Sequence, residues 1–94
     1  MRWSIPVEKG NEVIKNGSLD HTVQKLIQEL KPEATYFWTE NGGRAGMMVF
    51  DMKDPAQIPA IAEPLFMTAD AAVDLCPVMN NDDLQKALAA LQKD

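Results

Sequence analysis

A β-hairpin turn at Asn41-Gly42 is the feature that most constrains how this chain can fold. Residues 35–52 read TYFWTENGGRAGMMVFDM, so two runs of aromatic, β-branched and other apolar residues flank Glu-Asn-Gly-Gly. Asn-Gly between such runs is a strong hairpin signal, because tight hairpin turns need residues that tolerate positive φ. The sequence therefore predicts antiparallel strands at residues 34–40 and 44–52, the centre of a small sheet.

The chain before the hairpin predicts one strand and one helix. Residues 3–7 alternate apolar with small or polar side chains and predict a strand that ends at Pro6, which cannot donate a ladder hydrogen bond. Residues 8–16 predict a loop or a weak helical turn. Ser18 is the predicted N-cap of a helix that ends at Lys31, before a proline. One apolar stripe at helical spacing marks the buried face of this helix: Leu19, Val23, Leu26, Ile27 and Leu30.

A second helix is predicted directly after the hairpin. Asp54 is its predicted N-cap, with Pro55 at the first helical position and Gln57 at the third. Pro64 predicts a break near Glu63, because proline removes one backbone hydrogen bond of the helix. The residues predicted to face inward are Ile58, Ile61, Ala62 and Leu65.

The C-terminal part of the chain predicts a last strand and a last helix. Residues 72–76 alternate in polarity and stop at a proline, so they predict a short strand. Asn80 or Asn81 then caps a helix, and Lys93 near its end complements the helix dipole. The leucines predicted on the inner face of this helix are Leu84, Leu88 and Leu91.

The order of these elements predicts the fold class. The order β-α-β-β-α-β followed by a helix is that of a ferredoxin-like α+β domain, here one domain over residues 1–94, with both main helices on one face of an antiparallel sheet. The second hairpin strand is apolar on both sides, with Ala45, Met47 and Val49 on one and Met48, Phe50 and Met52 on the other. An antiparallel sheet with one face in water alternates apolar and polar residues. We therefore expect a second copy of the chain to cover the free sheet face, giving a homodimer, the dimeric α+β barrel.

Composition excludes several function classes. The 94 residues carry a formal net charge of −5, which argues against binding to nucleic acid or to an anionic membrane, since both need clustered Lys and Arg. The single cysteine, Cys76, excludes an internal disulfide framework and is expected to be a small buried hydrophobe. One histidine and one cysteine make a poor ligand set, so no metal site is expected. The N-terminal residues lack the apolar stretch of a signal peptide, and we therefore expect a cytoplasmic protein.

Short segments distributed along the chain carry a family resemblance. They are IPVE and GN within residues 5–11, KPEA and YF within 31–37, DMKDP at 51–55, IPAIAEP at 58–64, PVMN at 77–80 and DDL at 82–84. They resemble a family of short bacterial proteins of unknown function that looks like part of the dimeric α+β barrel superfamily. The resemblance implies a ferredoxin-like fold, a homodimer and no cofactor, since superfamily relatives run cofactor-free oxygenation or isomerisation between sheet and helices. Some similar proteins carry the name pantothenate synthetase, but one histidine cannot supply that enzyme's paired-histidine nucleotide motif.

The candidate catalytic residues are His21, Arg44 and Tyr36. His21 is the one side chain whose ordinary pKa lies near neutrality, and it is either a surface or cap residue of the first helix or a base in a pocket. Arg44 either pairs with Glu40 across the hairpin or grips a substrate carboxylate with two hydrogen bonds.

The candidate ligand-binding residues are Trp3, Tyr36, Trp38 and Arg44. The aromatic side chains combine an apolar body with a polar group, which suits a half-buried site, although we favour core or dimer packing over ligand contact for them. Two function classes therefore remain open. We favour a non-catalytic homodimer with a regulatory or partner-binding role, because the chain offers no matched acid–base pair. The alternative is a small enzyme of the cofactor-free oxygenase or isomerase type that binds a small organic ligand in a pocket between sheet and helices.

Overall fold

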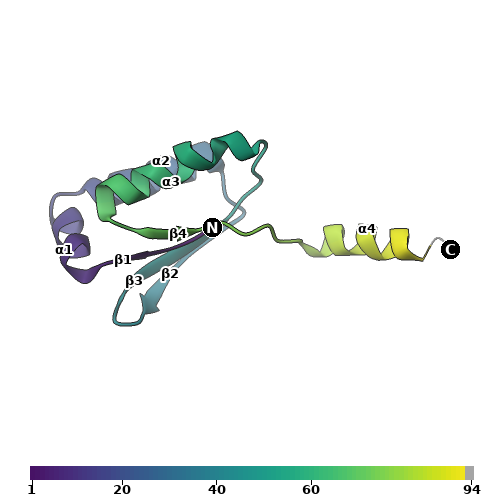
Figure 1. The fold of residues 1–94 in the computed structure, drawn as a ribbon, viewed down its shortest axis with the longest axis horizontal. Helices are drawn as coiled ribbons and strands as arrows, with labels where there is room; N and C mark the ends of the chain where they lie inside the picture. The colour runs from purple at the N-terminus through teal and green to yellow at the C-terminus, as the bar shows by residue number, and fades with distance from the viewer. Residues whose placement is uncertain (93–94) are drawn as a thin grey trace.

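The computed structural model describes residues 1–92 as a four-stranded antiparallel sheet with three helices on one face and a fourth helix extending away from it (Figure 1). The strands are β1 (Arg2–Ile5), β2 (Ala34–Glu40), β3 (Gly43–Val49) and β4 (Ala72–Asp74). The helices are α1 (Val7–Lys15), α2 (Ser18–Leu30), α3 (Ile58–Ala69) and α4 (Asn81–Leu91), with a 3-10 turn at Pro55–Gln57 before α3. Lys93, predicted at the end of the last helix, lies outside the described residues. Within residues 1–92, none of the helices has both the length and the apolar composition to span a bilayer.

The strands lie in the order β2-β3-β1-β4, and every neighbouring pair is antiparallel. The predicted hairpin is confirmed. Asn41 and Gly42 have φ values of 50° and 77°, so they form the two-residue turn with positive φ at both positions that a tight hairpin needs. Glu40 pairs with Gly43 across this turn, and β3 ends at Val49 rather than at residue 52.

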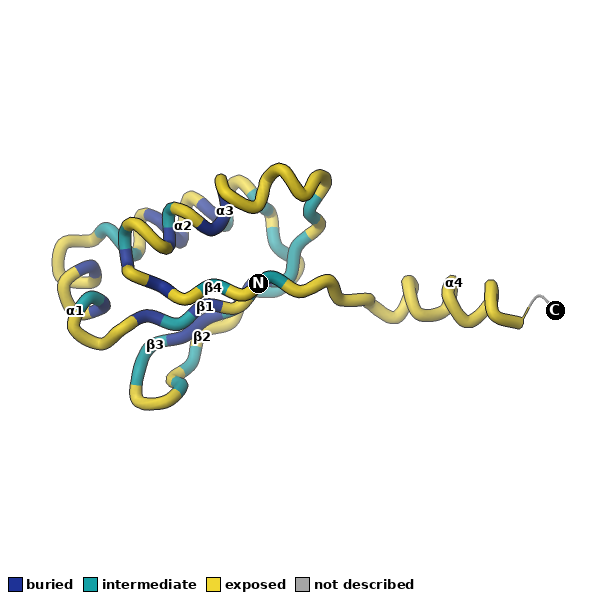
Figure 2. Tube along the Cα trace, viewed as in Figure 1, coloured by how far each residue is buried: buried dark blue, intermediate teal, exposed yellow. Residues whose placement is uncertain are grey.

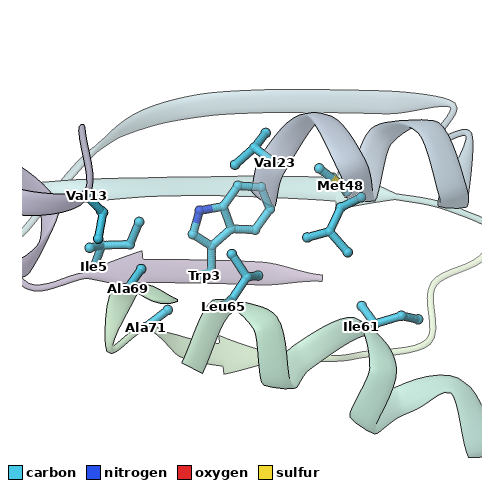
Figure 3. Packing of buried hydrophobic residues seen from close by; sticks show 10 residues of the cluster. Trp3, Ile5, Val13, Val23, Met48, Ile61, Leu65, Ala69 and Ala71 are labelled. Carbon is cyan, nitrogen blue, oxygen red and sulfur yellow. The ribbon is translucent and has the colours of Figure 1, made fainter. Parts of the chain in front are cut away.

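The core lies between the sheet and helices α1, α2 and α3. Trp3 and Ile5 of β1 and Met48 of β3 point to the helices, and Met48 is fully buried. Figure 3 shows the indole of Trp3 in the middle of this cluster, with Val23 of α2 and Leu65 of α3 on either side. The helices therefore cover one face of the sheet and leave the other uncovered.

Helix α1 was not predicted, and it changes the order of elements to β-α-α-β-β-α-β-α. Gly10 and Val13 are its buried residues, and polar and apolar residues do recur at helical spacing in this short segment. The glycine argued against a helix, because glycine usually weakens one. Here it leaves room for the end of the Arg44 side chain, which would have to shift if position 10 carried a β-carbon. The prediction of a loop or weak turn at residues 8–16 is therefore wrong.

Two predictions, one about a break in α3 and one about the N-cap of α2, are also corrected. Helix α3 runs through Pro64 without the predicted break near Glu63. Its buried side is continuous on both sides of the proline, and this packing outweighs the one hydrogen bond that Pro64 cannot donate. The predicted capping box of Asp54 and Gln57 is confirmed. At the start of α2, Gly17 rather than Ser18 occupies the N-cap position.

Helix α4 is formed as predicted but does not bury its predicted inner face. Asn80 caps it through a hydrogen bond from the Asp83 backbone N–H to the Asn80 side chain. Leu84 and Leu88 are 40% exposed and Leu91 is 78% exposed. Figure 2 shows that α4 is exposed along its whole length. Cys76, in the segment before α4, is exposed as well, so the prediction of a buried cysteine is wrong.

Candidate functional site

A cavity of about 320 Å³ lies between α2 and the sheet. The residues that line it are Trp3, Ile5, Leu19, Val23, Phe37, Trp38, Arg44 and Ala45. The edge of Phe37 meets the Trp3 indole at 71° with ring centres 6.1 Å apart, so the two rings form one aromatic wall. Phe37 is 61% exposed, which means that the cavity opens towards solvent beside the edge strand β2.

Among residues 1–92, Arg44 is the one charged residue in the lining of this cavity. Its guanidinium donates a hydrogen bond of 3.0 Å to Oδ1 of Asn11 and a longer one of 3.5 Å to the carbonyl of Val7. Both acceptors are neutral and belong to α1. The guanidinium fork has five N–H donors, so the α1 contacts orient Arg44 and leave donors for an anionic group.

The predicted pairing of Arg44 with Glu40 is wrong. Arg44 lies opposite Thr39 in the hairpin, whereas Glu40 lies opposite Gly43, and neighbouring positions of a strand point to opposite faces. Glu40 instead forms an ion pair with Arg2, whose guanidinium also stacks over the ring of Trp38 at 5.5 Å.

The sequence-predicted candidates are distributed over three regions. Arg44 and Trp3 line the cavity on the helix side of the sheet. Tyr36 and Trp38 lie opposite Met47 and Ala45 of β3, so their side chains point to the other face, although Trp38 also contributes to the cavity wall. His21 is exposed in the first turn of α2, away from the cavity lining.

The uncovered face of the sheet is the second candidate site, and we call it the outer face. The register assigns to it the alternate positions Arg2 and Ser4 in β1, Tyr36, Trp38 and Glu40 in β2, Ala45, Met47 and Val49 in β3, and Ala72 and Asp74 in β4. Its centre is apolar and aromatic, and Tyr36 is 62% exposed there. Arg2 lies opposite Met47, and its guanidinium reaches over the ring of Trp38 to pair with Glu40, so one ion pair crosses this apolar surface.

Two groups among the described residues have displaced pKa values, and neither lines the cavity. Burial lowers the pKa of the Met1 ammonium from 8.0, partly opposed by the nearby Cys76. This ammonium donates a 2.8 Å hydrogen bond to the carbonyl of Met48. The hydrogen bond from Lys53 to Asp51, at 2.7 Å, raises the pKa of Lys53 above 10.5.

The comparison with protein families gives a match over residues 1–92 to DUF3303, a domain of unknown function. The chain belongs to the DUF3303 family. No curated protein and no solved structure gave a significant match. The DUF3303 match extends over α4, so the projecting helix is part of the family domain.

Phe37 was not predicted to line the cavity of this DUF3303 chain. The hydrogen bonds from Arg44 to Val7 and Asn11 of α1 were not predicted either. The alternation of β2 was the signal for Phe37, because it lies between Tyr36 and Trp38 and must point to the opposite face. Asn11 was missed because the helix that carries it was not predicted, although the helical spacing of polar and apolar residues in 7–15 was a signal for that helix.

Proposed function

We propose that the protein is a non-catalytic homodimer, a regulatory or partner-binding module in which two copies pack through their outer sheet faces. The observation that carries this proposal is the uncovered outer face, whose centre holds Tyr36, Trp38 and Met47. Aromatic residues and methionine are enriched at protein interfaces, where they supply most of the buried apolar area. The proposed assembly is the dimeric α+β barrel.

The strand order supports this assembly. Written from the β4 edge, the order is 4-1-3-2 with the helices on one face, and we interpret the domain as ferredoxin-like with α1 as an added helix. A two-fold axis would bring two identical outer faces together, so each apolar centre would meet its own copy. The opposite charges of Arg2, Glu40 and Asp74 on the same face allow such a self-complementary contact.

A non-catalytic role is supported by the distribution of the candidate catalytic residues. His21, Arg44 and Tyr36 lie on the α2 surface, at the cavity and on the outer face, respectively. General acid–base catalysis needs groups within hydrogen-bond reach of one substrate. These three residues do not form such a group.

The proposal is tested by light scattering after size-exclusion chromatography. The wild-type chain is expected to elute with twice its mass of 10.4 kDa at micromolar concentration. Met47→Glu adds a carboxylate to the outer face and is expected to give a monomer. Arg2, which lies opposite position 47, is already paired with Glu40, so the two added charges would be buried without partners of their own in the interface. Met67→Glu is the matched control, since Met67 is 74% exposed on α3, away from the sheet.

Circular dichroism establishes that both variants keep the wild-type secondary structure. A wild-type monomer at micromolar concentration, or a Met47→Glu variant that remains as dimeric as Met67→Glu, would contradict the proposed assembly.

A second candidate function rests on the cavity. Its volume of about 320 Å³ is close to the lower end of the range for ligand pockets, so it suits a single-ring organic molecule. Arg44 could bind a carboxylate on such a molecule while Trp3 and Phe37 contact the ring. The second candidate function is therefore that of a small enzyme of the cofactor-free oxygenase or isomerase type, acting on a small organic ligand in this cavity.

Benzoate and benzamide distinguish this candidate from the first. A rise in melting temperature with benzoate but not with benzamide, lost in Arg44→Met, would establish a carboxylate site. Turnover of a bound acid, followed by oxygen uptake or by isomerisation of the acid, would then favour an enzyme. No stabilisation by aromatic acids would favour the non-catalytic module.

A further inference from the structure

The C-terminal arm, which we define as residues 75–92, is the part of the structure without a packing partner in its own chain. It starts at the end of β4 and ends with α4, and it gives the protein its longest dimension of 58 Å (Figure 1). Three leucines at i, i+4 and i+7 spacing form one stripe along α4, and all of them are exposed. Val78 and Met79, in the segment before α4, are exposed as well.

A helix of this length needs a packing partner to be stable in water. Helix α4 has 11 residues, and isolated helices shorter than about 12–15 residues are marginal because nucleation is unfavourable. The capping box of Asn80 and Asp83 contributes stability but does not bury the leucine stripe. We therefore expect Leu84, Leu88 and Leu91 to pack against a surface that does not contact them in the structure of the single chain.

The area of the outer face indicates that the covering surface belongs to a second copy. At about 16 Å² of sheet per residue, strands of four, seven, seven and three residues present only about 330 Å² on one face. A standard protein interface buries about 800 Å² of accessible surface on each partner. Accessible surface exceeds the flat footprint of a face, but a footprint of about 330 Å² is still small for such an interface, so we expect a second contact beside the sheet.

The arm supplies a comparable area. One face of an 11-residue helix covers about 160 Å², being about 16 Å long and about 10 Å wide. In a two-fold dimer each protomer both contributes one arm and receives one, so arm exchange adds about 320 Å² to each side. Arm exchange therefore about doubles the footprint of the proposed interface.

The position of the arm agrees with such an exchange. It leaves β4 after Asp74, which belongs to the outer face, so the arm continues directly from the proposed interface. The six residues before α4 can extend by about 20 Å and the helix by about 16 Å more. That reach is longer than the 27 Å second dimension of the molecule, so an arm can lie across a neighbouring protomer.

We propose that the two protomers exchange their C-terminal arms, so that the leucine stripe of each α4 packs on the body of the other protomer beside the sheet interface. This inference rests on the proposed homodimer and adds a second contact to it. A lipid surface is a poorer occupant, because α4 begins with Asp82 and Asp83 and carries only Lys86 as a cation.

The test compares Leu88→Glu with Ala89→Glu in the full chain. Both substitutions add one negative charge to α4, but Ala89 lies about 100° around the helix from Leu88 and outside the stripe. Analytical ultracentrifugation measures the dimer Kd of each variant. Leu88→Glu is expected to raise the Kd at least about tenfold, because both copies of the leucine lose their burial, and Ala89→Glu is expected to change it less than about threefold. Leu88→Ser serves as a second variant that adds no charge.

Cross-linking then determines to which chain the arm binds. Dimers are mixed from ¹⁴N- and ¹⁵N-labelled chains and treated with an amine-reactive cross-linker, and Lys86 reports the position of α4. Exchange is expected to give peptides that join Lys86 of one isotope to a body lysine of the other. Equal Kd values for the two glutamate variants, or Lys86 cross-links only within one isotope, would overturn arm exchange while the wild-type dimer remains. A tetrameric wild type would place the arms between dimers and would overturn it too. A monomeric wild type would overturn both the dimer and the exchange.

Discussion

Gly46 gives the sharpest test of how the cavity is built. It lies in β3 opposite Trp3 and Phe37, and the Trp3 indole lies directly over it. A β-carbon built at position 46 would come within 3 Å of three atoms of the indole. Gly46→Ala therefore forces either the indole or the strand to move.

The cost follows from how tightly Trp3 is held. The indole is 4% exposed and lies inside the core cluster, so it is not a flexible side-chain end that can turn aside (Figure 3). Overpacking of a filled core costs about 1–3 kcal/mol. Alanine recovers about 0.5–1 kcal/mol, because glycine loses more chain entropy in a strand. The net destabilisation at the middle of these ranges is about 1.25 kcal/mol, which corresponds to a fall in melting temperature of about 5–10 °C in a domain of this size.

Urea denaturation and thermal denaturation, followed by circular dichroism at one fixed protein concentration, measure the effect. A fixed concentration is needed because dimer dissociation would itself change the midpoint. The control is the same substitution in a Trp3→Phe background, where the smaller ring leaves room for the methyl group. If Gly46→Ala costs as much beside Phe as beside Trp, the indole is not the cause and the argument is refuted.

Two further predictions concern the turn and the N-terminal amine. Gly42→Ala puts a β-carbon at φ 77° and is expected to destabilise the fold by about 1 kcal/mol, measured by urea denaturation, whereas no loss would mean that the turn can change type. The lowered pKa of the Met1 ammonium means that the unfolded chain binds this proton more tightly than the folded chain. Stability is therefore expected to rise as the pH increases from the folded pKa of this group to 8.0, and N-acetylation should remove that rise, as the difference between urea titrations of free and acetylated chains will show.

The hairpin was predictable because its local signal agrees with its tertiary environment. Asn41 and Gly42 adopt the positive φ values that their sequence favours, and the flanking apolar runs become β2 and β3. Helix α1 was missed for a different reason. Its polar and apolar residues do recur at helical spacing, but the segment has only nine residues and contains Gly10, a poor helix former. Gly10 leaves room for the end of the Arg44 side chain, 34 positions away, and a long-range contact of this kind cannot be inferred from the local pattern.

The site was partly predictable from the hairpin register. A two-residue turn pairs Glu40 with Gly43, and this alone places Glu40 and Arg44 on opposite faces. The same register separates Tyr36 and Trp38 from Arg44. What the register cannot supply is the hydrogen bond of Arg44 to Asn11, because it depends on where α1 packs.

Helix α4 shows what an amphipathic pattern does and does not specify. The spacing of Leu84, Leu88 and Leu91 correctly predicts a helix with one apolar side. Amphipathicity predicts that this side packs against another surface, but it contains no information about which chain supplies that surface. The prediction of an inner face assumed that the covering surface lies in the same chain, and in residues 1–92 the leucines remain exposed. The outer face poses the same question with Tyr36, Trp38 and Met47. Because the arm and the outer face are joined at Asp74, one two-fold related copy can cover both, which is why we attribute them to a single assembly.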